Sequence, residues 1–132
     1  MATGTAATSA RKYHHDLVHY VSCPIVYTTL SYTIGKLPAG AAILDAGIVV
    51  TTAFAGGTPQ TADMGVGADT DGLATAIVLT TAGNIKADVT TASDDLYLAV
   101  DTDVNVTLSA GATPSAGAGF AWVTYIIADR TP

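Results

Sequence analysis

Apolar and polar side chains alternate in short runs along most of this chain, and glycine or proline separates many of the runs. A period of two places successive side chains on opposite faces of a β-strand, whereas a helix repeats every 3.6 residues. The run "IVYTTLSYTIG", residues 25–35, shows this alternation with a clean apolar side. We therefore expect one strand over residues 25–35, with one face lined by Val26, Thr28, Leu30, Tyr32 and Ile34.

The almost uncharged segment "GKLPAGAAILDAGIVVTTAFAGGT", residues 35–58, has turn chemistry at both ends. Pro38 has a fixed φ and Gly40 tolerates a positive φ, so "LPAG" predicts a tight turn before the strand. Gly47 indicates a bulge or a close backbone approach. Within the strand, Ile48, Val50, Thr52 and Phe54 are expected to point one way, and Val49, Thr51 and Ala53 the other.

The rest of the chain continues in the same manner. We expect a short strand over residues 62–67, a polar loop over 68–72, and inward side chains at Ile85, Ala87 and Val89. The segment 73–83 is compatible with a short helix or with a strand.

The C-terminal third predicts a hairpin, a connection and a last strand. Residues 96–101 and 103–110 are separated by turn residues and predict a hairpin, with core rows at Leu96, Leu98, Val100 and at Val104, Val106, Leu108. Residues 111–119 predict a flexible connection. The last strand, residues 120–129, is apolar on both faces, with Phe120, Trp122, Thr124 and Ile126 opposite Val123, Tyr125 and Ile127. Such a strand belongs in the middle of a sheet or against a neighbour.

These signals predict an all-β fold of about eight strands, arranged as a two-sheet β-sandwich or a barrel. The composition agrees, because the chain has no Glu and is rich in Thr, Val, Ala and Gly, which do not favour exposed helices. A length of 132 residues suits one domain. We expect an extended N-terminal arm over residues 1–16 and the sandwich domain over residues 17–132.

The charge pattern excludes several classes of function. The net charge is -6 and the five basic residues are scattered, so the chain lacks the basic patch that nucleic-acid binding requires. No apolar run is long enough to cross a membrane, and no secretion signal is visible, so we expect synthesis in the cytoplasm. Charged residues are only 12% of the chain, which indicates that part of its surface is covered by another chain.

Candidate chemical sites are weak. His14, His15 and His19 cluster near Asp16, but their spacing gives little support for zinc binding. "DTDG", residues 69–72, lacks the further ligands and the Glu of a calcium loop. Cys23 is the single cysteine and has no visible activating environment. We expect no catalytic residue, no metal and no cofactor.

Three segments carry a resemblance to a known family. They are "YTIGKLPAGAAILDAGIVVTTAFAGGT" at residues 32–58, "GVGADTDGLAT" at 65–75 and "AGAGFAWVTYI" at 116–126. Together they resemble the capsid decoration, or cement, proteins of tailed bacteriophages. The likeness covers residues 25–128, whereas residues 11–24 match nothing that can be transferred.

The resemblance implies a jelly-roll-like sandwich that forms a homotrimer and binds the major capsid protein on the outer surface of the virion head. It implies a structural role without catalysis, nucleic acid or membrane. The residues expected at a subunit or capsid interface are Arg11, Lys12, Tyr13, His14, His15, His19, Val49, Thr51 and Ala53.

Two alternatives stay open. One is another virion component, such as a tail, collar or fibre-associated module. The other is a carbohydrate-binding sandwich that contacts the host surface, for which Trp122 and Tyr125 are the obvious aromatic residues.

Overall fold

The structure is a computed structural model that describes residues 18–56, 60–89, 96–110 and 115–127. Within these ranges the chain forms nine strands and no helix. The described residues therefore contain no helix that is long and apolar enough to span a membrane. The strands are β1 (His19–Val26), β2 (Ser31–Leu37), β3 (Ala41–Ala55), β4 (Gln60–Val66), β5 (Asp69–Val78), β6 (Gly83–Lys86), β7 (Tyr97–Leu98), β8 (Thr102–Ala110) and β9 (Ala116–Ile127). The predicted all-β class is confirmed. The expected arm, residues 1–16, lies outside the described residues.

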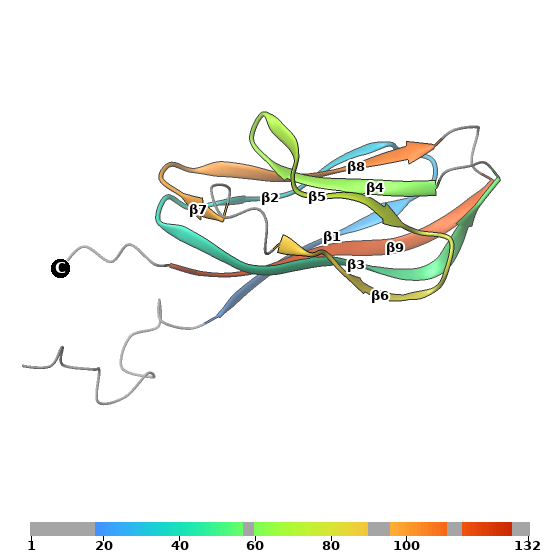
Figure 1. The fold of residues 1–132 in the computed structure, drawn as a ribbon, viewed down its shortest axis with the longest axis horizontal. Coiled ribbons are helices and arrows are strands. Elements are labelled where there is room, and N and C mark those ends of the chain that lie inside the picture. The colour runs from blue at the N-terminus through green and yellow to red at the C-terminus, as the bar shows by residue number, and fades with distance from the viewer. Residues whose placement is uncertain (1–17, 57–59, 90–95, 111–114, 128–132) are drawn as a thin grey trace, which may run out of the picture.

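Two antiparallel sheets lie one above the other as the layers of a sandwich (Figure 1). The five-stranded sheet has the order β1-β9-β3-β6, and β7 also pairs with β3. The four-stranded sheet has the order β2-β8-β4-β5. β9 lies between β1 and β3, so the strand that is apolar on both faces occupies the middle of a sheet, as expected.

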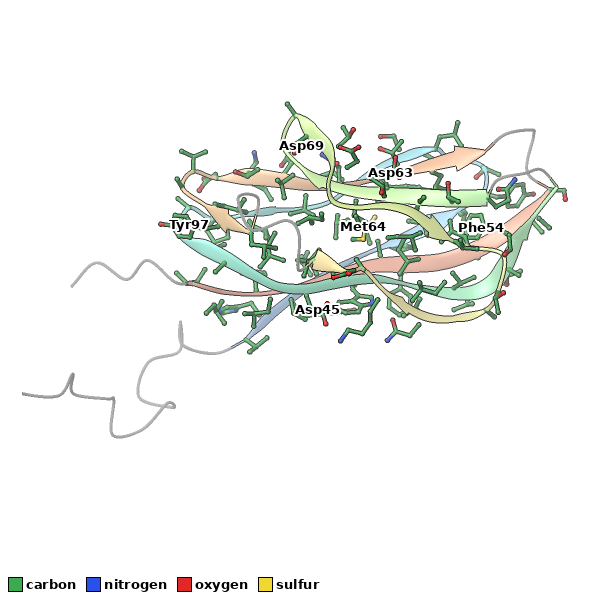
Figure 2. All side chains as sticks on the ribbon, in the orientation of Figure 1. Asp45, Phe54, Asp63, Met64, Asp69 and Tyr97 are labelled. Carbon is green, nitrogen blue, oxygen red and sulfur yellow. The ribbon has the colours of Figure 1, made fainter. Side chains whose placement is uncertain are left out.

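The core fills the space between the two layers. Figure 2 shows Met64 and Phe54 there, and their side chains are 0% and 3% exposed. The inward rows of both sheets interleave around them, with Ile48, Val50, Leu73, Val104, Val106, Leu108, Ala121 and Val123 all buried. The predicted core rows at Val104–Leu108 and at Ile48 and Val50 are therefore confirmed. Thr52 is exposed, however, because the register of β3 shifts after Val50.

The predicted single strand over residues 25–35 is wrong. β1 ends at Val26, and the chain turns over residues 27–30 before β2 begins in the other sheet. The two strands stay joined because the Tyr32 hydroxyl accepts a hydrogen bond from Val26 N (2.9 Å) and donates one to Val26 O (2.8 Å). The alternation continues through the turn without Gly or Pro, so it gave no signal of a change of layer.

The predicted polar loop at residues 68–72 is also wrong. A turn at Gly67 and Ala68 joins β4 to β5, and the residues from Asp69 onward already belong to β5 (Figure 1). Gly67 has φ of 57°, which a tight turn requires and glycine adopts without strain. The same strand resolves the ambiguous segment, since residues 73–78 are β-strand.

The predicted hairpin over residues 96–110 does not form. β7 pairs with Ala41 and Ala42 of β3, whereas β8 lies in the other sheet between β2 and β4. Val100 is therefore 67% exposed rather than part of the core. The predicted connection over residues 111–119 is too long, because β9 begins at Ala116. Ala87 and Val89 are buried as expected, and Ile85 is half-buried.

The irregular pairing of β4 with β5 leads to a stability prediction. Ala76 has φ of 56°, a left-handed conformation that costs a non-glycine residue about 1–2 kcal/mol. The carboxylate of Asp63 accepts a hydrogen bond from Ala76 N at 2.8 Å and holds this kink. We expect Asp63→Ala to lower the free energy of unfolding in urea by about 1–2 kcal/mol.

Asp103→Ala is the matched control for this prediction. Asp103 also lies on the solvent face of the four-stranded sheet, but its contact is an exposed ion pair with Lys36 at 3.3 Å. Such a pair contributes less than about 1 kcal/mol. Equal losses for the two variants would contradict a specific role for the Asp63–Ala76 bond.

Candidate interaction surface

The solvent side of the five-stranded sheet is unusually apolar, and we call it the apolar face. Because side chains alternate across a strand, the register fixes which residues lie on it. Trp122 of β9 has Ser22 of β1 on one side and Gly47 of β3 on the other. By the same register the apolar face comprises Tyr20, Val26, Val49, Tyr97, Phe120, Trp122 and Ile126, with Asn84 and Lys86 of the edge strand β6 beside them.

Exposed large hydrophobic side chains concentrate on and around this face. Eight such side chains occur among the described residues, and Tyr20 (60% exposed), Val26 (42%) and Tyr97 (48%) belong to the apolar face. Val18 directly precedes β1, and Leu44 lies in the bulge of β3 beside Asp45. A sheet face with several exposed large hydrophobic side chains is a candidate site of contact with another molecule.

Trp122 organises the centre of the apolar face. Gly47 lets the indole approach closely, since a Cβ at position 47 would lie 2.8 Å from the Trp122 ring. The indole Nε1 donates a hydrogen bond to Asn84 Oδ1 at 3.2 Å, so the ring extends from β9 across β3 to β6. The close backbone approach expected at Gly47 is thus confirmed, and the ring is held in one orientation.

A fluorescence prediction follows from this packing. In Gly47→Ala the added Cβ would lie 2.7 Å from the Ile85 carbonyl oxygen and 2.8 Å from the indole, so we expect both to be displaced and the bond to Asn84 to break, at a cost of about 1–3 kcal/mol in unfolding free energy. Trp122 is the single tryptophan, so its emission spectrum reports the displacement directly. Asn84→Ala removes only the hydrogen bond and should shift the emission less. An unchanged spectrum in Gly47→Ala would show that the ring does not depend on this approach.

The two solvent faces of the sandwich differ in charge. β1 and β9 contribute apolar and uncharged polar side chains to the apolar face, and no acidic or basic side chain. At its border, Lys86 Nζ lies 2.7 Å from Asp45 Oδ2, so these two charges offset each other. The four-stranded sheet instead exposes polar side chains, among them Thr33, Asp63, Asp103 and Thr107. Figure 2 shows Asp63 and Asp45 on opposite sides of the sandwich.

The structure brings together some of the residues predicted for an interface. Val49 lies on the apolar face against Phe120, and Thr51 Oγ1 donates a hydrogen bond to Ala118 O at 3.1 Å. Ala53 is half-buried and lies in the irregular pairing between Thr52 and Ala55. The remaining predicted residues of the arm, Arg11, Lys12, Tyr13, His14 and His15, lie outside the described residues.

His19 is not on the apolar face. Its register partner is Tyr125, and the two rings stack with centroids 5.3 Å apart. The side chain of His19 lies on the same side of the sheet as those of Val21 and Val123, which point toward the other sheet. His19 therefore belongs to the end of the sandwich interior.

The residues predicted for an interface did not include Tyr20, Val26, Phe120 and Trp122, which the register places on the apolar face. The available signal was the last strand, which is apolar on both faces and so has one apolar row more than a two-layer core needs. The described residues contain no group of three or more His, Cys, Asp or Glu side chains that could hold a metal ion.

Comparisons with known proteins identify solved structures that share this fold. No protein-family model and no curated protein matches the chain. A chain in the structure of the cyanophage Pam1 capsid asymmetric unit superimposes with a TM-score of 0.59 and 19% identity, over 83% of this chain and 84% of that chain. A chain in the acidic stable capsid structure of the Helicobacter pylori bacteriophage KHP30 gives 0.58 and 14%, over 86% and 90%. At these identities the likeness establishes a shared fold.

Proposed function

We propose that this chain is a structural protein of a bacteriophage virion that binds the outside of the icosahedral head. There it stabilises contacts between subunits of the major capsid protein, as a homotrimer and without cofactor, nucleic acid or catalysis. The observation that carries the proposal is the shared fold, which covers more than four fifths of this chain and of chains in two phage capsid structures.

The apolar face supplies the binding surface in this proposal. Its exposed aromatic and aliphatic side chains are removed from water when this face packs against the proteins of the shell. Tyr and Trp side chains, which are enriched at protein interfaces, combine a large apolar area with one polar group. The opposite, polar face then stays in contact with water.

Stabilisation of the head follows from mass action. A protein that binds the assembled shell but not its dispersed subunits shifts the equilibrium toward the shell. Each bound copy adds RT ln(1 + [L]/Kd), which is about 2.7 kcal/mol when the free concentration is one hundred times Kd. Because many copies bind each head, modest individual contributions add up to a large resistance to internal pressure and heat.

Binding to isolated heads tests the proposal. Purified protein is mixed with undecorated heads of the phage that carries it, and the heads are pelleted through a density cushion. We expect the protein to sediment with the heads in many copies and to raise their temperature of DNA release. A few copies per particle would instead indicate a tail or collar component, and no co-sedimentation would overturn the proposal.

Carbohydrate binding is a second candidate because the Trp122 indole lies on an exposed face with a polar neighbour, Asn84. An aromatic ring beside hydrogen-bonding groups is a common sugar platform. In this case the protein would bind a glycan array, and Trp122→Ala would abolish that binding in a folded protein. Head binding without glycan binding would exclude this candidate.

A further inference from the structure

The edge strands of the two sheets differ in how they are protected against pairing with another chain. In the described part of the chain, β1 forms one edge of the five-stranded sheet and β6 and β7 the other, while β2 and β5 are the edges of the four-stranded sheet. Charged side chains, irregular backbone or short length commonly keep an edge strand from pairing further. β2 carries Lys36, β5 carries Asp71 and is kinked at Ala76, and β6 and β7 have only four and two residues. All of these edges except β1 therefore have a protection of this kind.

β1 has none of these features. It is eight residues long, its sequence "HYVSCPIV" contains no Asp, Glu, Lys or Arg, and its register with β9 is unbroken. Tyr20 and Val26 are 60% and 42% exposed, and Val18, directly before the strand, is 61% exposed. A long, regular and apolar edge is the type to which a further strand adds most readily. The same strand is present on every copy of the chain, and two such edges related by a two-fold axis can pair antiparallel.

The pairing of β1 with β9 fixes which backbone groups of β1 point away from the sheet. In an antiparallel ladder, residues that bond to the partner strand alternate with residues whose N–H and C=O groups point away from it. Tyr27 N donates a hydrogen bond to Gly117 O at 3.1 Å, one residue beyond the end of β1, so the alternation can be counted back along the strand. The outward-directed residues are Tyr20, Ser22, Pro24 and Val26.

Pro24 and Val26 have little to offer a further strand. Pro24 has no N–H, and its carbonyl oxygen accepts a weak hydrogen bond from Cys23 Sγ at 3.3 Å. Both backbone groups of Val26 bond to one side chain of the other sheet, since the Tyr32 hydroxyl accepts from Val26 N at 2.9 Å and donates to Val26 O at 2.8 Å. The hydroxyl therefore takes the place that the N–H and C=O groups of a partner residue would fill in a ladder.

We propose that the Tyr32 hydroxyl and Pro24 close the β1 edge to strand pairing with a second copy of this chain. Of the outward-directed residues in β1, only Tyr20 and Ser22 keep both backbone groups open, and two residues are fewer than the usual minimum length of a strand. The apolar face, which β1 borders, is then left to meet its partner by packing of side chains. Only this last role rests on the proposed function, because the closed edge is a property of the free protein.

Self-association of the purified protein, followed by sedimentation velocity, tests the closed edge. Pro24→Thr restores the missing N–H, and Tyr32→Phe removes the hydroxyl but keeps the ring. We expect the double variant to form species larger than the wild-type oligomer, with a mass fraction at least ten-fold above that of the wild type at the same concentration. Each single variant should form fewer of them. Tyr97→Phe is the matched control, because it removes the hydroxyl of another exposed tyrosine of the apolar face, on β7 rather than at the β1 edge.

Two further measurements connect the association with the edge. Amide exchange followed by NMR should be at least ten-fold faster at Val26 N in dilute Tyr32→Phe than in the wild type. Ser22→Pro, added to the double variant, removes an outward N–H without loss of a bond to β9 and should restore the wild-type oligomer.

Three results would overturn the inference: an unchanged oligomer in the double variant, unchanged exchange at Val26 in Tyr32→Phe, or association that Tyr97→Phe causes equally or that Ser22→Pro does not reverse. None of these measurements involves heads. An open edge would therefore not contradict head binding, and a lack of head binding would not contradict the closed edge.

Discussion

Replacing Tyr20 and Val26 together with aspartate is expected to lower affinity for phage heads at least 100-fold and leave the fold intact. Both side chains are exposed on the apolar face, so the free chain should lose little stability. In the bound state the two carboxylates would be removed from water without partners. A 100-fold loss corresponds to about 2.7 kcal/mol, which is modest for burying two unpaired charges.

The matched control changes the opposite face. Thr33→Asp/Thr107→Asp adds the same two charges to the polar face of the four-stranded sheet, where the two residues lie on neighbouring strands. Binding is measured through the change in Trp122 fluorescence as heads are added, and by co-sedimentation. If the control pair lost binding and the Tyr20/Val26 pair did not, the two faces would have the reverse of the roles assigned to them.

Gly117→Ala is expected to be the most destabilising single substitution among those considered, at about 3–5 kcal/mol. Gly117 has φ of 143°, a conformation that costs other residues about 1–3 kcal/mol. In addition, a Cβ at this position would overlap the ring of Phe54, which is buried in the core (Figure 2). Forcing an extra carbon into a packed core adds about 1–3 kcal/mol.

Gly83→Ala separates these two causes. Gly83 has φ of 148°, close to that of Gly117, but a Cβ there would meet no atom within 4 Å. It should therefore show the backbone cost alone, about 1–3 kcal/mol. Urea denaturation of both variants gives the difference. Equal losses would mean that the core around Phe54 yields to the added carbon without cost.

The sequence carried enough information for the fold class because the alternation depends on local burial alone. Ile48, Val50, Val104 and Val106 each point inward as the period of two predicts. Pairing was not predictable in the same way. The segment around Leu98 looks like the first half of a hairpin, yet it pairs with β3, because the alternation states which face is buried and not which strand is adjacent.

The candidate interface was only partly predictable for a related reason. Val49 and Thr51 were recognised because their row is uncharged, and both lie on the solvent side of the sheet. Trp122 and Phe120 were not among the residues predicted for the interface, because both rows of the last strand are apolar and the alternation does not say which row faces solvent. Only the register between β9 and β3 shows that Ala121 and Val123 fill the core and that the aromatic row lies on the other side.

A cryo-electron microscopy map of undecorated heads mixed with this protein tests the central assignment most directly. We expect added density on the outside of the shell in which the strands β1, β9 and β3 lie against the major capsid protein and the β4–β5 hairpin projects into solvent. Density that places β2, β8 and β4 on the shell, or a shell that binds no protein at all, would contradict the assignment of the apolar face.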